Sequence, residues 1–239
     1  KEFDEDLVNE LVKSSKKIGI TFQFDAHIQS IEKDNNEFIV HYLDSNQQAT
    51  TISCDMVVHG AGRVADIDEL ELNNANVSFT QKGVEVNEYL QSVSNPNVFA
   101  AGDAANTKGL DLTPIASMEA NVVIHNLLHE ERIVPDYRVM PSIVFTQPKL
   151  AMLGYSEYEA EKEGLKIDVK LIDTSKWYTY KRTNEESALF KIILNQEDNR
   201  IIGVHILGGN ADDLINHFAM IMTFDLPYEK VKAINFAYP

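Results

Sequence analysis

Hydrophobic and polar positions predict a helix and then a hairpin in the N-terminal part of the chain. In the segment FDEDLVNELVKSSKKIGI, Leu7, Leu11 and Ile18 fall on one helical face. Acidic residues open this segment and lysines close it before Gly19, an order that matches the helix dipole. The segment AHIQSIEKDNNEFIVHYLD then alternates apolar and polar residues around an Asn-Asn turn, which predicts a β-hairpin.

Strand patterns continue after the hairpin. The run TISCDMVVHGAGR predicts a strand that is buried on both faces from Met56 to Val58 and ends in a glycine-rich turn. Short strands are expected around Val77 and Val84. This first part of the chain therefore combines helix and strand patterns.

A long helix and a linker divide the chain. We expect a buried strand in NVFAAGDAA that ends at Gly102, followed by a helix from Pro114 to about His129. Pro135 and Pro141 then bracket a segment without helix or strand periodicity, which we interpret as a linker at a domain boundary.

The pattern beyond the boundary is α+β with an antiparallel sheet. SEYEAEKEG predicts a short helix capped by Ser156 and stopped at Gly164. Three alternating strands are expected in KIDVKLID, SALFKIILNQ and RIIGVHILGG, with a Glu-Asp-Asn turn between the last two. A helix in NADDLINHFAMIMTFDL and another from Pro227 complete the domain. The apolar face of the longer helix, which must pack on a core, consists of Leu214, Phe218, Ile221 and Met222.

Charge narrows the choice of partners. The chain has 37 acidic and 21 basic side chains in 239 residues, a net charge of −16, which repels nucleic acids and anionic membrane surfaces. No apolar run approaches the roughly 20 residues that cross a bilayer, and no leader pattern opens the chain. We therefore expect no nucleic-acid or membrane partner and a cytoplasmic location. Because the first residue is Lys1 and the helical pattern runs to the end, we also expect a piece of a longer polypeptide.

Two glycine-containing segments are candidates for ligand binding. GAGRVA, from Gly60 to Ala65, satisfies the dinucleotide fingerprint, but the acidic segment DIDELEL follows where a pyrophosphate would sit. We favour a structural turn there. In NVFAAGDAA, Gly102 permits close approach to a ligand, and Asp103 either accepts hydrogen bonds from a polyol or only caps a turn.

The head of the long helix is the third candidate. Pro114 suits a first helical turn, and the amides from Ile115 to Ser117 lack partners inside the helix. The partial positive charge at the N-terminus of this helix would stabilise an anion, such as the N1/O2 edge of a reduced flavin.

Four segments resemble the pyridine nucleotide-disulfide oxidoreductases, the glutathione reductase-like flavoproteins. NVFAAGDAANTKGLDLTPIASMEA is similar to their second flavin motif, and DMVVHGAGRVADIDELEL to the turn out of their nicotinamide-binding domain. PSIVFTQPKLAMLGYSEYEAEKEG and FKIILNQEDNRIIGVHILGGNADDLINHFAMIM resemble their dimerisation domain. The resemblance covers nearly the whole chain, in order.

The resemblance implies a fold and three domains. It predicts an α/β remnant of nucleotide-binding domains followed by an α+β dimerisation domain with an antiparallel sheet. Residues 1–64 would be the C-terminal part of an NAD(P)-binding domain and residues 65–137 the returning part of an FAD-binding domain. Residues 138–239 would be the dimerisation domain, forming a homodimer from about Pro141 onward.

The resemblance also implies two cofactors, FAD and NAD(P)H. Asp103 would bind the ribityl and phosphate region, with Gly102 beside it. Thr113, Pro114 and Ile115 would face the pyrimidine ring, and Gly62 would lie between the nicotinamide and flavin domains.

Catalytic residues are not assigned. Tyr238 in FAYP stands where the family's reductases carry an acid-base histidine, and a tyrosine pKa near 10 makes a poor general base at neutral pH. Cys54 is the only cysteine and is interpreted as a small core residue. Structural roles are also expected for the histidines, which are His27, His41, His59, His125, His129, His205 and His217. The WYTYKR cluster is read as a strand end or dimer contact.

Two functions stay open from the sequence. The chain is the C-terminal part of an FAD-dependent NAD(P)H oxidoreductase that passes hydride from nicotinamide to flavin and then to a small-molecule acceptor. Alternatively, it is a dimerisation fragment without flavin. The upstream fingerprint and the redox cysteine pair, which would separate these hypotheses, are not in this sequence.

Overall fold

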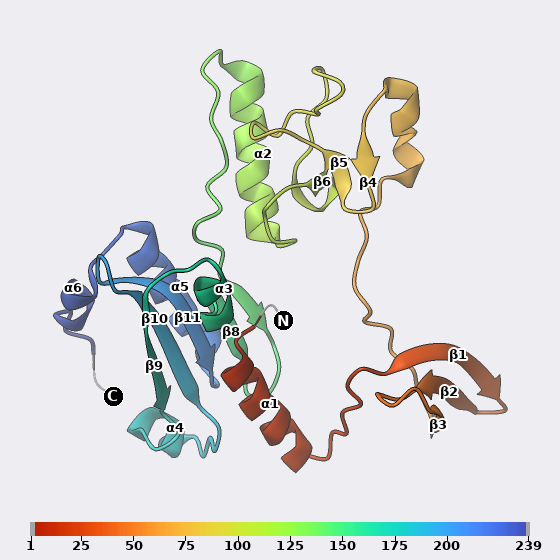
Figure 1. The fold of residues 1–239 in the computed structure, drawn as a ribbon, viewed down its shortest axis with the longest axis vertical. Helices are drawn as coiled ribbons and strands as arrows, with labels where there is room; N and C mark the ends of the chain where they lie inside the picture. The colour runs from red at the N-terminus through yellow and green to blue at the C-terminus, as the bar shows by residue number, and fades with distance from the viewer. Residues whose placement is uncertain (1–2, 238–239) are drawn as a thin grey trace. The chain divides into compact units, whose positions relative to one another are not determined.

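The computed structural model describes residues 3–237, drawn in Figure 1. The chain divides into two compact units. One consists of Ser15–Arg63, and the other of the residues up to Ser14 together with those from Val64 onward. Each unit is described by itself.

The smaller unit is an antiparallel meander. Strands β1 (His27–Asp34), β2 (Glu37–Leu43) and β3 (Ala49–Cys54) pair in sequence order, which confirms the predicted hairpin. Ile31, Val40 and Ile52 lie opposite one another across the three strands, so they share one face.

The strand predicted from Met56 to Val58 is wrong. β3 ends at Cys54, and the side chains of Met56 and Val58 are 74% and 82% exposed. β3 pairs with β2, and Phe38 near the start of β2 already lies opposite Cys54, so β2 has no residues left to pair with residues 56–58.

The larger unit begins with helix α1 (Glu5–Lys17), which confirms the predicted helix. After the meander it continues with two short 3₁₀ helices, η1 (Asp68–Leu70) and η2 (Leu72–Ala75). A small sheet contains β4 (Phe79–Thr80), β5 (Gly83–Glu85) and β6 (Ala105–Asn106). Helix α2 (Thr113–Leu128) follows, close to the expected bounds.

The strand predicted to end at Gly102 is also wrong. Phe99 forms only an isolated bridge to Gln91, and a 3₁₀ turn, η3, occupies Gly102–Ala104. Gly102 has a φ of +64°, a left-handed conformation, and it lies in this turn and not in a strand ladder. The strand comes after the turn, as β6, which pairs in parallel with β5.

The C-terminal part is a five-stranded antiparallel sheet in the order β7-β8-β11-β10-β9. The predicted strands are β9 (Ile167–Asp173), β10 (Leu189–Asn195) and β11 (Arg200–Leu207), and all three are confirmed. β7 (Ser142–Val144) and β8 (Leu150–Gly154) were not predicted. They lie beyond the expected linker, which ends at Pro141, and β7 is a three-residue strand between Pro141 and Pro148, too short to show an alternating pattern.

Three helices of this part were predicted from the sequence. α3 (Glu157–Lys162) begins at a capping box, in which Ser156 and Glu159 exchange hydrogen bonds, and Gly164 follows with a φ of +74°. α5 (Ala211–Thr223) and α6 (Tyr228–Lys232) are the other two predicted helices. α4 (Tyr178–Arg182) was not predicted: the WYTYKR segment forms a helix, so its interpretation as a strand end is wrong.

Helices cover both faces of the sheet. α5 packs on the main core, to which Leu153, Val204 and Ile206 contribute, and its predicted apolar face lies against that core. α1 packs on the other face, where fully buried Leu7 contacts Leu150 and Leu207. These two layers enclose the sheet at its central strands.

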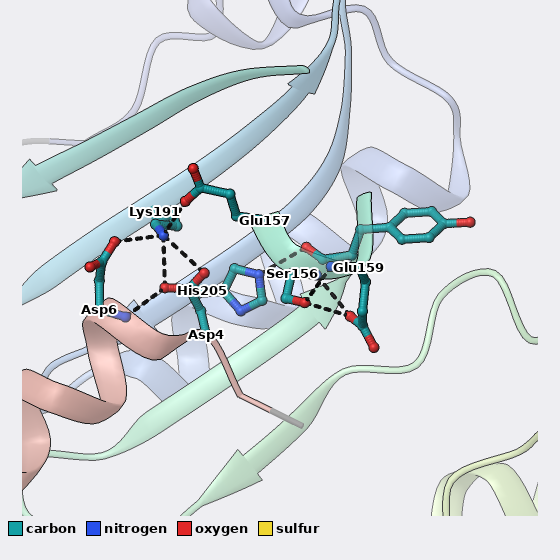
Figure 2. A network of polar contacts seen from close by, with 8 residues as sticks. Asp4, Asp6, Ser156, Glu157, Glu159, Lys191 and His205 are labelled. Atoms are coloured by element: carbon teal, nitrogen blue, oxygen red, sulfur yellow. Dashed lines mark hydrogen bonds and ion pairs between the residues drawn. The ribbon is translucent and has the colours of Figure 1, made fainter. Parts of the chain in front are cut away.

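A buried charge also holds α1 on the sheet (Figure 2). The Lys191 ammonium on β10 lies 2.9 Å from Asp4, 2.7 Å from Asp6 and 2.6 Å from Glu157, and its side chain is 3% exposed. Burial alone would lower the pKa of Lys191, but the hydrogen bonds to Asp6, Glu157 and Asp4 outweigh it and hold that pKa above its usual range.

Candidate functional site

A glycine-aspartate turn meets the first turn of α2. A Cβ placed on Gly102 would lie 2.9 Å from the Cβ of Ala116, so only glycine permits this approach. Asp103 follows Gly102 in the 3₁₀ turn and its side chain is exposed. The structure thus brings the Gly-Asp turn and the head of α2, which the sequence singled out separately, into contact.

The head of α2 offers backbone donors. Thr113 and Pro114 are exposed at its start, Ile115 is buried, and Leu112 caps the helix without a side-chain hydrogen bond. The expectation that the amides from Ile115 to Ser117 lack partners is only partly right, because the Ala116 amide donates to the Leu112 carbonyl at 3.0 Å. Pro114 has no N–H, so the amides of Thr113 and Ile115 are the ones without an acceptor inside the helix.

A buried carboxylate behind this turn was missed from the sequence. Glu119 on α2 is 1% exposed. Its carboxylate accepts hydrogen bonds from the Gly102 amide at 2.6 Å, the Thr107 hydroxyl at 2.7 Å and the Tyr137 hydroxyl at 2.6 Å. Gly109 closes over this group, since a Cβ there would lie 2.8 Å from the carboxylate. We call Glu119, Gly102, Thr107 and Tyr137 the Glu119 cluster.

Tyr137 is a fixed donor in this cluster. Burial, reinforced by the hydrogen bond to the Glu119 carboxylate, holds the pKa of Tyr137 well above its usual range. The hydroxyl therefore stays protonated and donates a hydrogen bond to the Glu119 carboxylate.

A second polar residue of α2 holds the same linker. The buried Asn126 side chain donates to the carbonyls of Tyr89 and Ile133 and accepts from the Ile133 amide at 2.8 Å. The segment from Ile133 to Tyr137 is therefore attached to α2 at two points, and Figure 1 shows it running back beside this helix.

A periodic signal could have revealed both residues. The buried positions of α2 are Ile115, Glu119, Val122 and Asn126, a helical spacing with two polar members. A polar side chain on a buried helical stripe requires hydrogen-bond partners, so the pattern predicts a buried polar network.

Gly62 belongs to the other compact unit. It lies in an exposed irregular segment, and no helix begins there, because η1 starts only at Asp68. A pyrophosphate loop requires a helix N-terminus after the glycines. The arrangement agrees with a structural turn.

Of the remaining candidates, Tyr238 lies outside the described residues. Cys54 ends β3 and is partly buried. His205 is buried, with Nε2 2.9 Å from the Tyr155 carbonyl, which is a structural contact. Over residues 3–237, no group of three or more His, Cys, Asp or Glu side chains could hold a metal ion, and no helix is long and apolar enough to span a membrane.

Family models match both parts of the chain. The model described as pyridine nucleotide-disulphide oxidoreductase matches residues 1–120. The model described as the dimerisation domain of pyridine nucleotide-disulphide oxidoreductases matches residues 140–239.

Curated relatives include proteins of two lengths. An uncharacterised 19.7 kDa protein of a Staphylococcus aureus mercuric resistance operon is 49% identical over 170 residues, which are 71% of this chain and 94% of that protein. Mercuric reductase from S. aureus is 28% identical over 96% of this chain and 41% of its own length. Mycothione reductase from Mycobacterium tuberculosis is 35% identical over 74% of this chain and 39% of its own.

Solved structures agree on the fold. The HOCl-induced flavoprotein disulfide reductase RclA from Escherichia coli aligns with a TM-score of 0.87 at 24% identity, covering 99% of this chain and 53% of that one. The chain thus spans about half the length, or less, of the reductases it matches.

Proposed function

The chain belongs to the pyridine nucleotide-disulphide oxidoreductase family, and from this premise we propose that it forms the C-terminal part of an FAD-dependent NAD(P)H oxidoreductase. Residues 1–120 match the pyridine nucleotide-disulphide oxidoreductase model, and residues 140–239 match the dimerisation domain of that family. Contact between the Gly102-Asp103 turn and the head of α2 is the observation that carries the proposal.

The residues present fit one part of a flavin. Asp103 is exposed and can accept hydrogen bonds from ribityl hydroxyls, and Gly102 leaves room for close approach. Thr113, Pro114 and Ile115 present the first turn of α2 to the pyrimidine edge, where a positive helix end favours negative charge. Gly62 stays a proposed contact between the nicotinamide and flavin regions.

Bound FAD would supply hydride chemistry, accepting from NAD(P)H and donating to a small-molecule acceptor. The residues of this chain would bind and orient it. Asp103 would hold the sugar-like chain by hydrogen bonds, and the α2 amides would stabilise the ring edge on which negative charge gathers.

A homodimer is part of the proposal. Residues 140–239 match a dimerisation domain, and this part exposes large apolar side chains such as Phe145 at 76% and Phe224 at 71%. Exposed apolar groups of this size are common at interfaces. A cytoplasmic location stays a prediction.

FAD titration tests the flavin site. We expect Asp103→Ala to weaken FAD binding by about tenfold, the loss of one charge-assisted hydrogen bond, measured by quenching of flavin fluorescence. Asp66→Ala, another exposed carboxylate, is the control and should leave the affinity unchanged. Equal affinities of the Asp103 variant and the wild type would remove Asp103 from the site.

A second function is a flavin-free dimerisation protein. Two observations favour it: α1 closes one face of the C-terminal sheet with residues of this chain alone, and a relative of 19.7 kDa matches over nearly its full length. A colourless protein that binds no added FAD but sediments at twice 26.9 kDa would favour this function over the oxidoreductase.

A further inference from the structure

The Glu119 cluster joins segments that are far apart in the sequence. It brings together the Gly102-Asp103 turn, Thr107 after β6, helix α2 and the linker residue Tyr137. Hydrogen bonds to a charged acceptor are stronger than those between neutral groups, and here three donors share one buried carboxylate. Moving any one donor therefore disturbs the others.

The linker contacts the C-terminal domain immediately beyond this cluster. Tyr137 donates to Glu119, whereas Val139, two residues later, packs against the core of β8, β11 and α5. Arg138 between them lies 3.9 Å from Asp225, which follows α5. Only Arg138 therefore separates the Glu119 cluster from the dimerisation core, which is too short a segment to absorb a displacement of that core without moving Tyr137.

The linker is also fixed at its N-terminal end. Asn126 fixes Ile133 through both its amide and its carbonyl. Tyr137 is thus held between an anchor on α2 and an anchor on the C-terminal core. Its hydroxyl is the contact through which the linker reaches the Gly102 turn.

We propose that Glu119 and Tyr137 are positioning residues that couple the dimerisation domain to the Gly102-Asp103 turn. Packing of Val139 sets the position of Tyr137, Tyr137 orients the Glu119 carboxylate, and that carboxylate holds the Gly102 amide. The coupling itself is a property of this fold, and its consequence for flavin rests on the proposed function.

The test follows the Gly102 amide by hydrogen exchange and ¹H–¹⁵N NMR without any flavin. Tyr137→Phe keeps the ring and removes only the hydroxyl, and Glu119→Gln keeps the shape and removes the charge. We expect both to shift the Gly102 resonance and to speed its exchange at least tenfold. Tyr89→Phe is the matched control, because Tyr89 contacts Asn126 through its backbone carbonyl, which the change preserves.

A double-mutant cycle tests the direction of the coupling. Val139→Ala should speed Gly102 exchange in the wild-type background and leave it unchanged in the Tyr137→Phe background. An unchanged Gly102 amide in Tyr137→Phe would overturn the proposal, as would equal effects of Val139→Ala in both backgrounds.

FAD titration of the same variants separates this inference from the proposed function. Weaker FAD binding by Tyr137→Phe, together with faster Gly102 exchange, supports both. If the wild type binds no FAD while the Gly102 amide responds as expected, the coupling stands and the flavin site fails.

Discussion

Lys191 shows how one buried charge can hold two distant segments of the chain. Its ammonium meets the carboxylates of Asp4 just before α1, Asp6 in the first turn of α1 and Glu157 at the start of α3. Asp4 is the most deeply buried of the three carboxylates, with a side chain only 3% exposed, like that of Lys191 itself. Burying such a charge is costly without a partner, so each member of the cluster depends on the others.

We predict that Lys191→Met lowers the free energy of unfolding by about 3–5 kcal/mol, because Asp4 is left buried without its cation. Urea denaturation gives the measurement. Lys149→Met, which removes a half-exposed pair with Asp212, is the control and should cost about 1 kcal/mol or less. Equal losses in the two variants would contradict the buried-charge argument.

His205 gives a prediction for pH. Burial lowers its pKa, against the opposing effect of the hydrogen bond to the Tyr155 carbonyl. The unfolded state therefore takes up a proton at about pH 6.5 while the folded state does not, so stability falls as the pH drops below that value.

The variant His205→Gln isolates this contribution, because its amide can still donate to Tyr155. We expect the wild type to lose more stability than the variant between pH 7.5 and pH 5, measured by urea unfolding. Asp4, Glu159 and Lys191 face the imidazole in both proteins, so their own titration largely cancels in the difference. Parallel pH profiles would rule out His205 as the source.

At the scale of elements, the sequence predicts local structure well where periodicity and end signals agree. α2 begins at a Thr-Pro pair, and α3 carries a capping box, so their bounds follow from the residues themselves. β10 and β11 alternate and share a short turn. The expected strand ending at Gly102 failed because apolar composition alone does not distinguish a strand from a turn.

The candidate site was predictable only in part. Asp103, Thr113 and Pro114 stand in segments with recognisable glycine, proline and helix-end signals. Glu119 required knowledge of which α2 face is buried, and Tyr137 lies in a linker without periodicity. Contacts between distant segments, such as Asp4 with Lys191, leave no local pattern in the sequence.

The capping box of α3 yields a prediction at this scale. Ser156→Ala should lower the free energy of unfolding by about 1 kcal/mol, because the Glu159 amide loses its acceptor. Thermal denaturation together with hydrogen exchange at Glu159 measures it. Ser117→Ala is the comparison, since that hydroxyl only bonds a carbonyl within α2, and its removal should be nearly neutral. A silent Ser156 variant would show that the box does not stabilise α3.

At the scale of the whole molecule, one compact unit is built from two separate segments of the chain, and the other unit lies between them in the sequence. Residues up to Ser14 belong with those from Val64 onward, and Ser15–Arg63 forms its own unit. Two contacts attach α1 to the C-terminal sheet besides the Lys191 cluster. Leu7 packs against Leu150 and Leu207, and Glu10 accepts a hydrogen bond from Ser187.

We predict that α1 stays bound to residues 64–239 after the chain is cut. Protease recognition sequences inserted after Ile20 and after Gly60 would allow specific cleavage, because both positions are exposed and outside regular elements. Size-exclusion chromatography with mass spectrometry should find the α1 peptide in the fraction that contains the C-terminal sheet.

The same cleavage in a Leu7→Ala, Lys191→Met double variant serves as the control. The α1 peptide should separate there, because both the apolar contact and the buried charge are lost. Separation of α1 in the wild type as well would contradict the proposed attachment.

The position of α1 on the C-terminal sheet also has a consequence in time. Asp4 and Lys191 are 187 residues apart, so at a typical rate of about 5–20 residues per second the ribosome makes the partner of α1 roughly ten to forty seconds later. A 13-residue helix is only marginally stable alone. During that interval the nascent chain carries an amphipathic segment with an unsatisfied apolar face, which chaperones can bind. The helix can pack only after the strands that it covers have been made.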